Sequence, residues 1–185
     1  MKFQELSLPG VWLITPQLFE DARGSFRRTF CSEEFAKRGL DISMAQGNVS
    51  ENLHPGTLRG FHYQIPPHQE AKTITCITGA VFDIVLDLRP ASATFLKHAV
   101  VELSDQNRNS LHVPAGCANA WLSLQPNTVL HYYMSIAYRP AADRGIRYDD
   151  PLFRFPWPRK PEVISAKDAG YPDFDLPTFL REAGG

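Results

Sequence analysis

Prolines and glycines interrupt this chain so often that they leave little room for long helices. The 185 residues contain 15 prolines and 12 glycines, and the segments between them are short and rich in Val, Ile, Thr, Phe and Tyr. Short β-rich segments separated by turn residues are typical of an all-β sandwich or barrel. We therefore predict an all-β fold with many short strands.

Nine strands are predicted from these segments. They cover residues 11–15, 26–31, 56–63, 72–77, 80–88, 97–103, 110–113, 118–124 and 129–138. In the fifth strand Phe82 and Ile84 alternate with Asp83, and this period of two predicts that one face of the strand is directed toward the core. The dipeptide Thr78-Gly79, between the fourth and fifth strands, predicts a tight hairpin turn.

One or two short helices are predicted at the periphery of the sheets. The first begins at Ser32, which can cap it, has acidic residues in its first turn and ends at Gly39. The second follows Pro177, a residue that suits the first helical position, and continues to about Glu182. The segment 140–175, rich in Pro and Asp, is predicted to be a loop.

Length and composition limit the possible function classes. A chain of 185 residues with 43% hydrophobic residues is sufficient for a single domain, residues 1–185, to bury a core. Its formal net charge of -1 provides no overall attraction to nucleic acid. The three cysteines lack paired spacing, which is typical of reduced thiols in the cytosol. Without a continuous apolar stretch at the N-terminus, we expect a cytoplasmic protein with neither a nucleic-acid nor a membrane partner.

Two stretches have the outline of cupin motifs but lack most of the metal ligands. Gln64 occupies the place of a second His, and Asn119 occupies the place of the remaining His. Because a stable divalent site needs about three protein ligands and only His62 remains, we expect no metal and no other cofactor. A metal-dependent cupin is therefore the weaker alternative. The outline predicts a cupin-type jelly roll, a double-stranded β-helix whose interior can hold a ligand.

Further motifs agree in order and spacing with one cupin family. They are FEDARGSF (19–26), QGNVS (46–50), LRGFHYQ (58–64), VLDLRPASATF (85–95), PAGCANAW (114–121) and SAKD (165–168). With Lys72 ten residues after His62, the chain resembles the dTDP-4-dehydrorhamnose 3,5-epimerase family from about Gly10 to Asp168. The resemblance implies an epimerase that inverts C3 and/or C5 of a nucleotide-linked 4-keto-6-deoxy sugar by removing the proton next to the ketone.

The resemblance also implies a catalytic set. His62 corresponds to the base, Asp168 to the carboxylate that orients it and stabilises the imidazolium, and Tyr132 to the proton donor on the opposite face of the sugar. Lys72 corresponds to a cation near the ketone that favours the enolate. Inversion next to a ketone needs such a base, acid and enolate-stabilising group. We expect His62, Lys72, Asn119 and Tyr132 to line one internal cavity.

A larger set of residues is implied to bind the nucleotide sugar. Guanidinium groups suit bidentate binding of phosphate. The set comprises Arg23, Phe26, Arg28, Gln46, Asn48, Arg59, Asn119, Tyr138, Asp143 and Lys167. Two positions depart from the family pattern, because Asn119 replaces a His and Arg28 replaces a Glu. These departures predict fewer inverted carbons or a different sugar.

Several alternatives remain open from the sequence. The nucleotide could be dTDP, GDP or CDP. A non-catalytic cupin that binds nucleotide sugars would share the fold and the arginines, although binding alone does not need a base, its orienting carboxylate and an acid together. The family usually forms homodimers with strands exchanged at the N-terminus, and the resemblance implies the same here.

Overall fold

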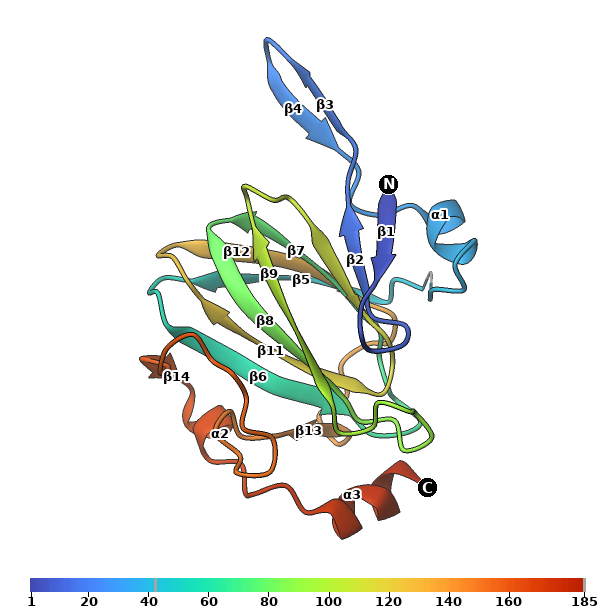
Figure 1. The fold of residues 1–185 in the computed structure, drawn as a ribbon, viewed down its shortest axis with the longest axis vertical. Coiled ribbons are helices and arrows are strands. Elements are labelled where there is room, and N and C mark those ends of the chain that lie inside the picture. The colour runs from blue at the N-terminus through green and yellow to red at the C-terminus, as the bar shows by residue number, and fades with distance from the viewer. Residues whose placement is uncertain (42, 185) are drawn as a thin grey trace.

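Two sheets dominate the computed structural model, which describes residues 1–41 and 43–184 (Figure 1). The first sheet has the order β1 (Lys2–Glu5), β2 (Trp12–Thr15), β10 (Ser110–Val113), β7 (Lys72–Thr78), β12 (Thr128–Met134) and β5 (Gln46–Asn52). The second has the order β13 (Asp143–Gly145), β6 (Thr57–Gln64), β11 (Cys117–Ser123), β8 (Ala80–Asp87) and β9 (His98–Ser104), with β14 (Val163–Ile164) also paired to β6. A separate hairpin consists of β3 (Leu18–Asp21) and β4 (Gly24–Arg27).

The two sheets pack face to face and enclose the main core (Figure 1). Consecutive strands pass from one sheet to the other, as from β7 to β8 and from β10 through β11 to β12. Apolar side chains from both sheets meet between them, among them Ile74, Val85, Leu111 and Leu130. Each such burial stabilises the fold by about 1.5–3 kcal/mol relative to exposure of the side chain. The predicted all-β, cupin-type jelly roll is confirmed.

Strand β8 is buried on both of its faces. Its Val81 and Val85 belong to the core between the sheets, and by alternation Asp83 points the same way. Ile84 and Leu86 belong to a second core, which aromatic residues of the C-terminal segment complete. The prediction of a single core face is therefore wrong. An alternating pattern within one strand cannot show that the C-terminal segment covers the second face of that strand.

The segment 140–175 was predicted to be a loop, and this is only partly correct. It contains β13, β14 and the short helix α2 (Ala166–Ala169). Strand β13 pairs antiparallel with β6, where Asp143 lies opposite Gln64, and β14 pairs parallel with the start of β6. Such short strands form here because the edge strand of a sheet has unpaired backbone N–H and C=O groups with which they can pair. The local sequence of the short strands gives no sign of this pairing. Their pairing brings α2 next to β6.

The predicted strands overlap β2, β4 and β6 to β12, whereas β1, β3 and β5 were missed. Residues 28–31, predicted as strand, lie outside β4. The hairpin predicted at Thr78-Gly79 is also wrong, because β7 and β8 belong to different sheets and the turn is a corner between them. Gly79 has φ +78°, and a Cβ there would lie 2.4 Å from Thr128 Oγ1, so the corner requires glycine.

Both predicted helices are present. Helix α1 (Ser32–Ala36) begins at Ser32, but Cys31 is its N-cap residue and no side chain caps it, so the predicted capping role of Ser32 is wrong. Helix α3 (Leu176–Ala183) has Asp175 as its N-cap, whose side chain accepts a hydrogen bond from the Thr178 N–H at 3.1 Å. Among residues 1–41 and 43–184, no helix has the length and apolar character that crossing a membrane requires.

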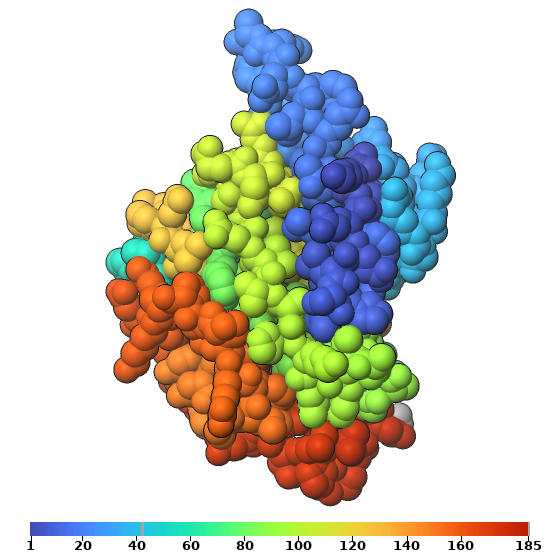
Figure 2. Space-filling view, in the orientation of Figure 1, coloured from blue at the N-terminus to red at the C-terminus, as the bar shows by residue number. Residues whose placement is uncertain are grey.

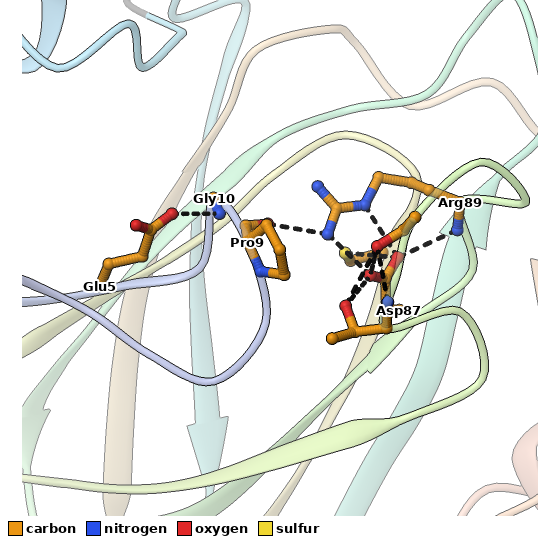
Figure 3. Close-up of polar contacts among 8 residues, drawn as sticks. Glu5, Pro9, Gly10, Asp87 and Arg89 are labelled. Carbon is orange, nitrogen blue, oxygen red and sulfur yellow. Dashed lines mark hydrogen bonds and ion pairs between the residues drawn. The ribbon is translucent and has the colours of Figure 1, made fainter.

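An ion pair between the buried Asp87 and the partly exposed Arg89 ties the end of β8 to the N-terminal turn (Figure 3). Arg89 donates from Nε to Asp87 Oδ1 and from Nη2 to the Pro9 carbonyl, both at 2.8 Å. The hydroxyls of Ser92 and Thr94 each donate to Asp87 Oδ2 at 2.6 Å. Burial alone would raise the pKa of Asp87, but these hydrogen bonds lower it to about 2. The ionised carboxylate therefore joins three segments of chain.

Candidate active site

A cavity of about 590 Å³ lies between the two sheets, next to the C-terminal segment. Residues from β5, β6, β11, β12 and the stretch around α2 surround it. The lining residues are Val49, Ser50, Glu51, Thr57, Leu58, Arg59, His62, Trp121, Tyr132, Val163, Ile164, Ser165, Lys167 and Asp168. The cavity thus collects the three residues for which the sequence predicted proton transfer, His62, Tyr132 and Asp168.

His62 and Asp168 form a hydrogen-bonded pair at the cavity wall. His62 Nε2 lies 2.8 Å from Asp168 Oδ1, and Asp168 is almost fully buried. The carboxylate is held by the Gly60 N–H at 3.3 Å, while the Ser165 side chain caps α2 by accepting from the Asp168 N–H at 3.0 Å. Because Nε2 is engaged with the carboxylate, Nδ1 is the ring nitrogen left to accept a proton from a ligand.

Hydrogen bonds keep the Asp168 carboxyl in its ionised form. Burial alone would raise its pKa, but the hydrogen bond and charge of His62, together with contacts from Gly60 and Ser165, hold the pKa below its ordinary value. An anion beside the imidazole stabilises the imidazolium that forms when His62 takes up a proton. The pair therefore has the geometry of a general base and its orienting carboxylate.

Tyr132 reaches the same cavity from the other sheet. It lies on β12, and its ring centroid is 5.9 Å from that of Trp121. Burial raises the pKa of the Tyr132 phenol above its ordinary value, so the group is protonated at neutral pH and can donate a proton. A base on one sheet and an acid on the facing sheet can serve opposite faces of a ligand between them.

Lys72 and Asn119 were expected to line the cavity, and the lining residues include neither. Both are buried, with exposed fractions of 8% and 2%. Lys72 Nζ donates to the His62 carbonyl at 3.1 Å and to Asn119 Oδ1 at 3.1 Å, and it pairs with Glu70 at 3.2 Å. Lys72 thus contacts the backbone of His62 from within the protein and is not among the residues that line the cavity.

Several predicted ligand contacts form a connected polar group beside the cavity. Gln46 Nε2 donates to Asn48 Oδ1 at 2.8 Å, and Gln46 Oε1 accepts from the Tyr138 N–H at 2.9 Å. The Tyr138 hydroxyl donates to Asp143 at 3.2 Å, and Asp143 also pairs with Lys167. The hydrogen bond to Asp143 raises the pKa of Lys167. Of this group, only Lys167 lines the cavity.

Arg59 lies at the cavity with its guanidinium partly anchored. Its Nε donates to Asn52 Oδ1 at 3.1 Å, and its Nη2 donates to the Glu51 carbonyl at 3.2 Å. Lys167 also lines the cavity, so the lining includes two cationic side chains. Cations in this position suit an anionic ligand such as a diphosphate.

Arg23, Phe26 and Arg28 lie outside the cavity of their own chain. The β3–β4 hairpin projects from the body of the molecule, and Figures 1 and 2 show its blue segment standing clear of the rest. Arg23 pairs with Asp21 within the hairpin at 2.6 Å, and Arg28 pairs with Glu34 at 3.5 Å. Within one chain, the structure does not bring these three residues to His62.

Two aromatic residues of the site were given no role from the sequence. Trp121 lines the cavity, and its Nε1 has no hydrogen-bond partner among the described residues. The Tyr171 ring stands edge-on to the His62 ring, with centroids 6.5 Å apart. Trp121 lies within the motif PAGCANAW and could have been found there, whereas no sequence signal indicated Tyr171. No group of three or more His, Cys, Asp or Glu suited to holding a metal occurs within residues 1–41 and 43–184.

Comparison with known proteins identifies the family. The sequence model of the dTDP-4-dehydrorhamnose 3,5-epimerase family matches residues 5–175. The chain is 38% identical over 183 residues to dTDP-4-dehydrorhamnose 3,5-epimerase of Sinorhizobium fredii. The alignment covers 98% of this chain and 94% of that relative.

Solved structures agree with this match. The Bacillus anthracis dTDP-4-dehydrorhamnose 3,5-epimerase with TDP and PPi bound has a TM-score of 0.90 at 33% identity, covering 94% of this chain and 99% of that one. ChmJ, a 3'-monoepimerase of Streptomyces bikiniensis in complex with dTDP-quinovose, has a TM-score of 0.85 at 33% identity. The match covers 97% of this chain and 88% of the ChmJ chain. This chain belongs to the dTDP-4-dehydrorhamnose 3,5-epimerase family.

Proposed function

We propose that this protein is an epimerase that inverts one or both carbons next to the ketone of a nucleotide-linked 4-keto-6-deoxy sugar. The observation that carries the proposal is that the His62–Asp168 pair and Tyr132 reach one cavity from facing sheets. A site that only binds has no need for this combination of base, orienting carboxylate and acid.

The reaction follows from the positions of these groups. His62 Nδ1 removes the proton from the carbon next to the ketone, and the electrons of the C–H bond pass into the enolate. Asp168 stabilises the resulting imidazolium. Tyr132 then returns a proton to the same carbon from the opposite face, which restores the ketone and inverts the carbon. Solvent returns the proton to the phenol and removes the one held by His62.

The charge of Lys72 supports the enolate from behind His62. All three N–H groups of its ammonium have protein acceptors, namely the His62 carbonyl, Asn119 and Glu70. A buried cation at this position lowers the energy of a developing negative charge in the cavity. Lys72 therefore acts through the electrostatic field of its charge, while all of its hydrogen bonds are made to protein groups and none to the substrate.

The nucleotide part of the substrate is proposed to lie at the cavity mouth. Arg59 and Lys167 would contact the diphosphate, and Tyr138 with the Gln46–Asn48 pair would contact the nucleoside. The relatives that were solved with TDP or a dTDP-sugar favour dTDP as the nucleotide. GDP and CDP are the alternatives, and competition among the three nucleotides for binding distinguishes them.

The working unit is proposed to be a homodimer in which the β3–β4 hairpin of one chain reaches the site of the other. The hairpin exposes 56% of Phe19 and 69% of Phe26, an apolar surface that a partner would cover. A second chain could then supply Arg23, Phe26 and Arg28 to the ligand. A cytoplasmic location is part of the proposal, supported by cysteines that are all free in the described structure.

The number of inverted carbons is tested directly by deuterium incorporation. Asn119 cannot gain or lose a proton as an acid or base at neutral pH, as a His at this position could, and Arg28 changes the charge of a proposed ligand contact. We expect inversion at fewer carbons than a full 3,5-epimerase, as the likeness to a 3'-monoepimerase also suggests. The protein is incubated in D₂O with dTDP-, GDP- and CDP-linked 4-keto-6-deoxy sugars, and each carbon is followed by NMR. Rapid inversion at both carbons of the dTDP sugar would refute this restriction, and no exchange with any sugar would favour a non-catalytic binding protein.

A further inference from the structure

Asp83 is a fully buried acid that the proton-transfer steps do not use. It lies on β8 opposite Trp121 of β11, with an exposed fraction of 0%. Its Oδ2 accepts a hydrogen bond from Asn119 Nδ2 at 3.4 Å, whereas Oδ1 has no partner within the described residues. Burial of a carboxyl group is unfavourable in free energy unless specific contacts compensate for its lost hydration. A buried acid beside the site therefore needs a structural or functional explanation.

The Asn119 amide links Asp83 to the cation behind the base. Its Oδ1 accepts from Lys72 Nζ at 3.1 Å, and the same Nζ donates to the His62 carbonyl at 3.1 Å. Glu70, which pairs with Lys72 at 3.2 Å, also accepts from Gln64 Nε2 at 3.1 Å. A continuous buried chain of contacts therefore leads from Asp83 to the backbone of His62.

Only one orientation of the Asn119 amide suits this chain. With Oδ1 toward Lys72, an acceptor meets an ammonium donor. With the amide turned over, Nδ2 would face the ammonium, and two donors would be buried against each other. An acceptor on the far side of the amide selects the productive orientation, and Asp83 Oδ2 is that acceptor.

The charge balance of this chain is compatible with an enolate nearby. Glu70 offsets part of the Lys72 charge, and it is the ammonium that contacts the His62 carbonyl, whereas Glu70 contacts Gln64. Burial raises the pKa of Asp83 well above its ordinary value, with the Asn119 hydrogen bond and the Lys72 charge acting in the other direction. A neutral Asp83 can still accept from Asn119 and adds no negative charge that would oppose the enolate.

We propose that Asp83 is a positioning residue of the active site, which acts through Asn119 to hold the Lys72 ammonium against the backbone of His62. The inference rests on the proposed function, because the group that is positioned serves the enolate. Asp83 itself touches neither the substrate nor the reacting atoms.

Two substitutions with the same branching as Asp test whether the acceptor at position 83 is what matters. Asp83→Asn keeps an acceptor for Asn119, whereas Asp83→Leu removes it. We expect Asp83→Leu to lower kcat roughly 10- to 100-fold with KM changed by less than ~3-fold, and Asp83→Asn to remain within ~3-fold of wild type. Thr75→Val is the matched control, since it removes a buried hydroxyl contact to Ser110 between β7 and β10 of the other sheet, and neither residue lines the cavity. The control should lower the melting temperature and leave kcat unchanged.

A double-mutant cycle tests whether Asp83 acts through Asn119. In an Asn119→Leu background, Asp83→Leu should change kcat by less than ~2-fold, because the amide that it orients is absent. Equal losses of kcat for Asp83→Leu with and without Asn119 would overturn the proposal. So would wild-type kcat in Asp83→Leu, or an equal loss in Asp83→Asn and Asp83→Leu.

A measurement on the wild-type protein needs neither substrate nor a folded variant. We expect the side-chain amide protons of Asn119 to exchange with D₂O at least ~10-fold more slowly than those of the surface residue Asn107, since Asp83 and burial hold them. Unprotected Asn119 amide protons would overturn the proposal. Absence of epimerase activity toward every sugar would instead contradict the proposed function. The exchange measurement does not depend on activity, so it would still test whether Asn119 is held in place.

Discussion

His62 Nε2 lies 2.8 Å from Asp168 Oδ1, although 106 residues separate the two along the chain. The contact depends on β14, which pairs with the start of β6 and brings α2 against that strand. The orientation of the base therefore depends on a segment that is bound to the edge of a sheet by few hydrogen bonds.

Loss of the base should abolish exchange, and loss of its partner should reduce it. His62→Ala removes the proton acceptor, so deuterium incorporation should fall by roughly 10²- to 10⁴-fold. Asp168→Ala leaves an acceptor that is poorly oriented, and the decrease should be smaller. Incorporation is followed by NMR, with His54→Ala as control because the His54 side chain is exposed and absent from the cavity lining. Wild-type incorporation by His62→Ala would remove the assignment of the base.

Tyr132→Phe should separate proton removal from inversion. The base remains, so solvent deuterium should still enter the substrate, but the donor on the opposite face is lost. Formation of the inverted sugar should therefore fall by roughly 10²- to 10⁴-fold, more than the exchange does. Tyr133→Phe is the matched control, because the Tyr133 ring packs against His131 and Phe30. Unchanged inversion by Tyr132→Phe would show that another group is the acid.

Low pH should lower the free energy of unfolding, in part because Asp87 becomes protonated. Its folded-state pKa is lowered to about 2, so its ionised form stabilises the protein above the unfolded-state pKa of about 3.9, and this contribution is lost as pH falls through both values. The difference between the two pKa values corresponds to a contribution of about 2–3 kcal/mol at pH 7.

Urea unfolding of wild type and Asp87→Asn between pH 7 and pH 2 measures this contribution. The difference in unfolding free energy should be greatest near pH 7 and shrink below pH 4. Asp173→Asn serves as control, since Asp173 is a largely exposed partner of Arg147 and should show little difference at any pH. A difference between wild type and Asp87→Asn that stays constant down to pH 2 would contradict the prediction.

A shared site should allow two inactive chains to restore activity. If the hairpin of one chain serves the cavity of the other, a hybrid of His62→Ala and Arg23→Ala chains contains one site with both native residues. Random pairing at equal amounts makes half of the dimers hybrid, so about a quarter of wild-type activity should return on co-expression.

The matched control for this experiment is co-expression of His62→Ala with Tyr132→Phe. Both residues line the same cavity of one chain, so no hybrid site has both and activity should stay low. Equal recovery in the two mixtures, or none in the first, would show that Arg23 does not act on the partner's site.

The sequence by itself determined the fold class, most strands and the identity of the central residues. Period-two patterns and turn residues are local properties, which is why nine strands could be placed and the jelly roll predicted. The resemblance of the sequence motifs to one family implied His62, Tyr132 and Asp168 as a catalytic set, and the three residues line one cavity in the structure.

Only the tertiary structure decided which residues face the cavity and which lie behind it. Lys72 and Asn119 lie behind the cavity wall, Arg23 lies on a projecting hairpin, and Asp83 supports the site from within the core. Thr78-Gly79 has the sequence of a hairpin but forms a corner between sheets. The physical reason is that these positions depend on packing between distant segments. A local pattern specifies the conformation of a strand, whereas its neighbours are selected by the burial and hydrogen bonding of the whole chain.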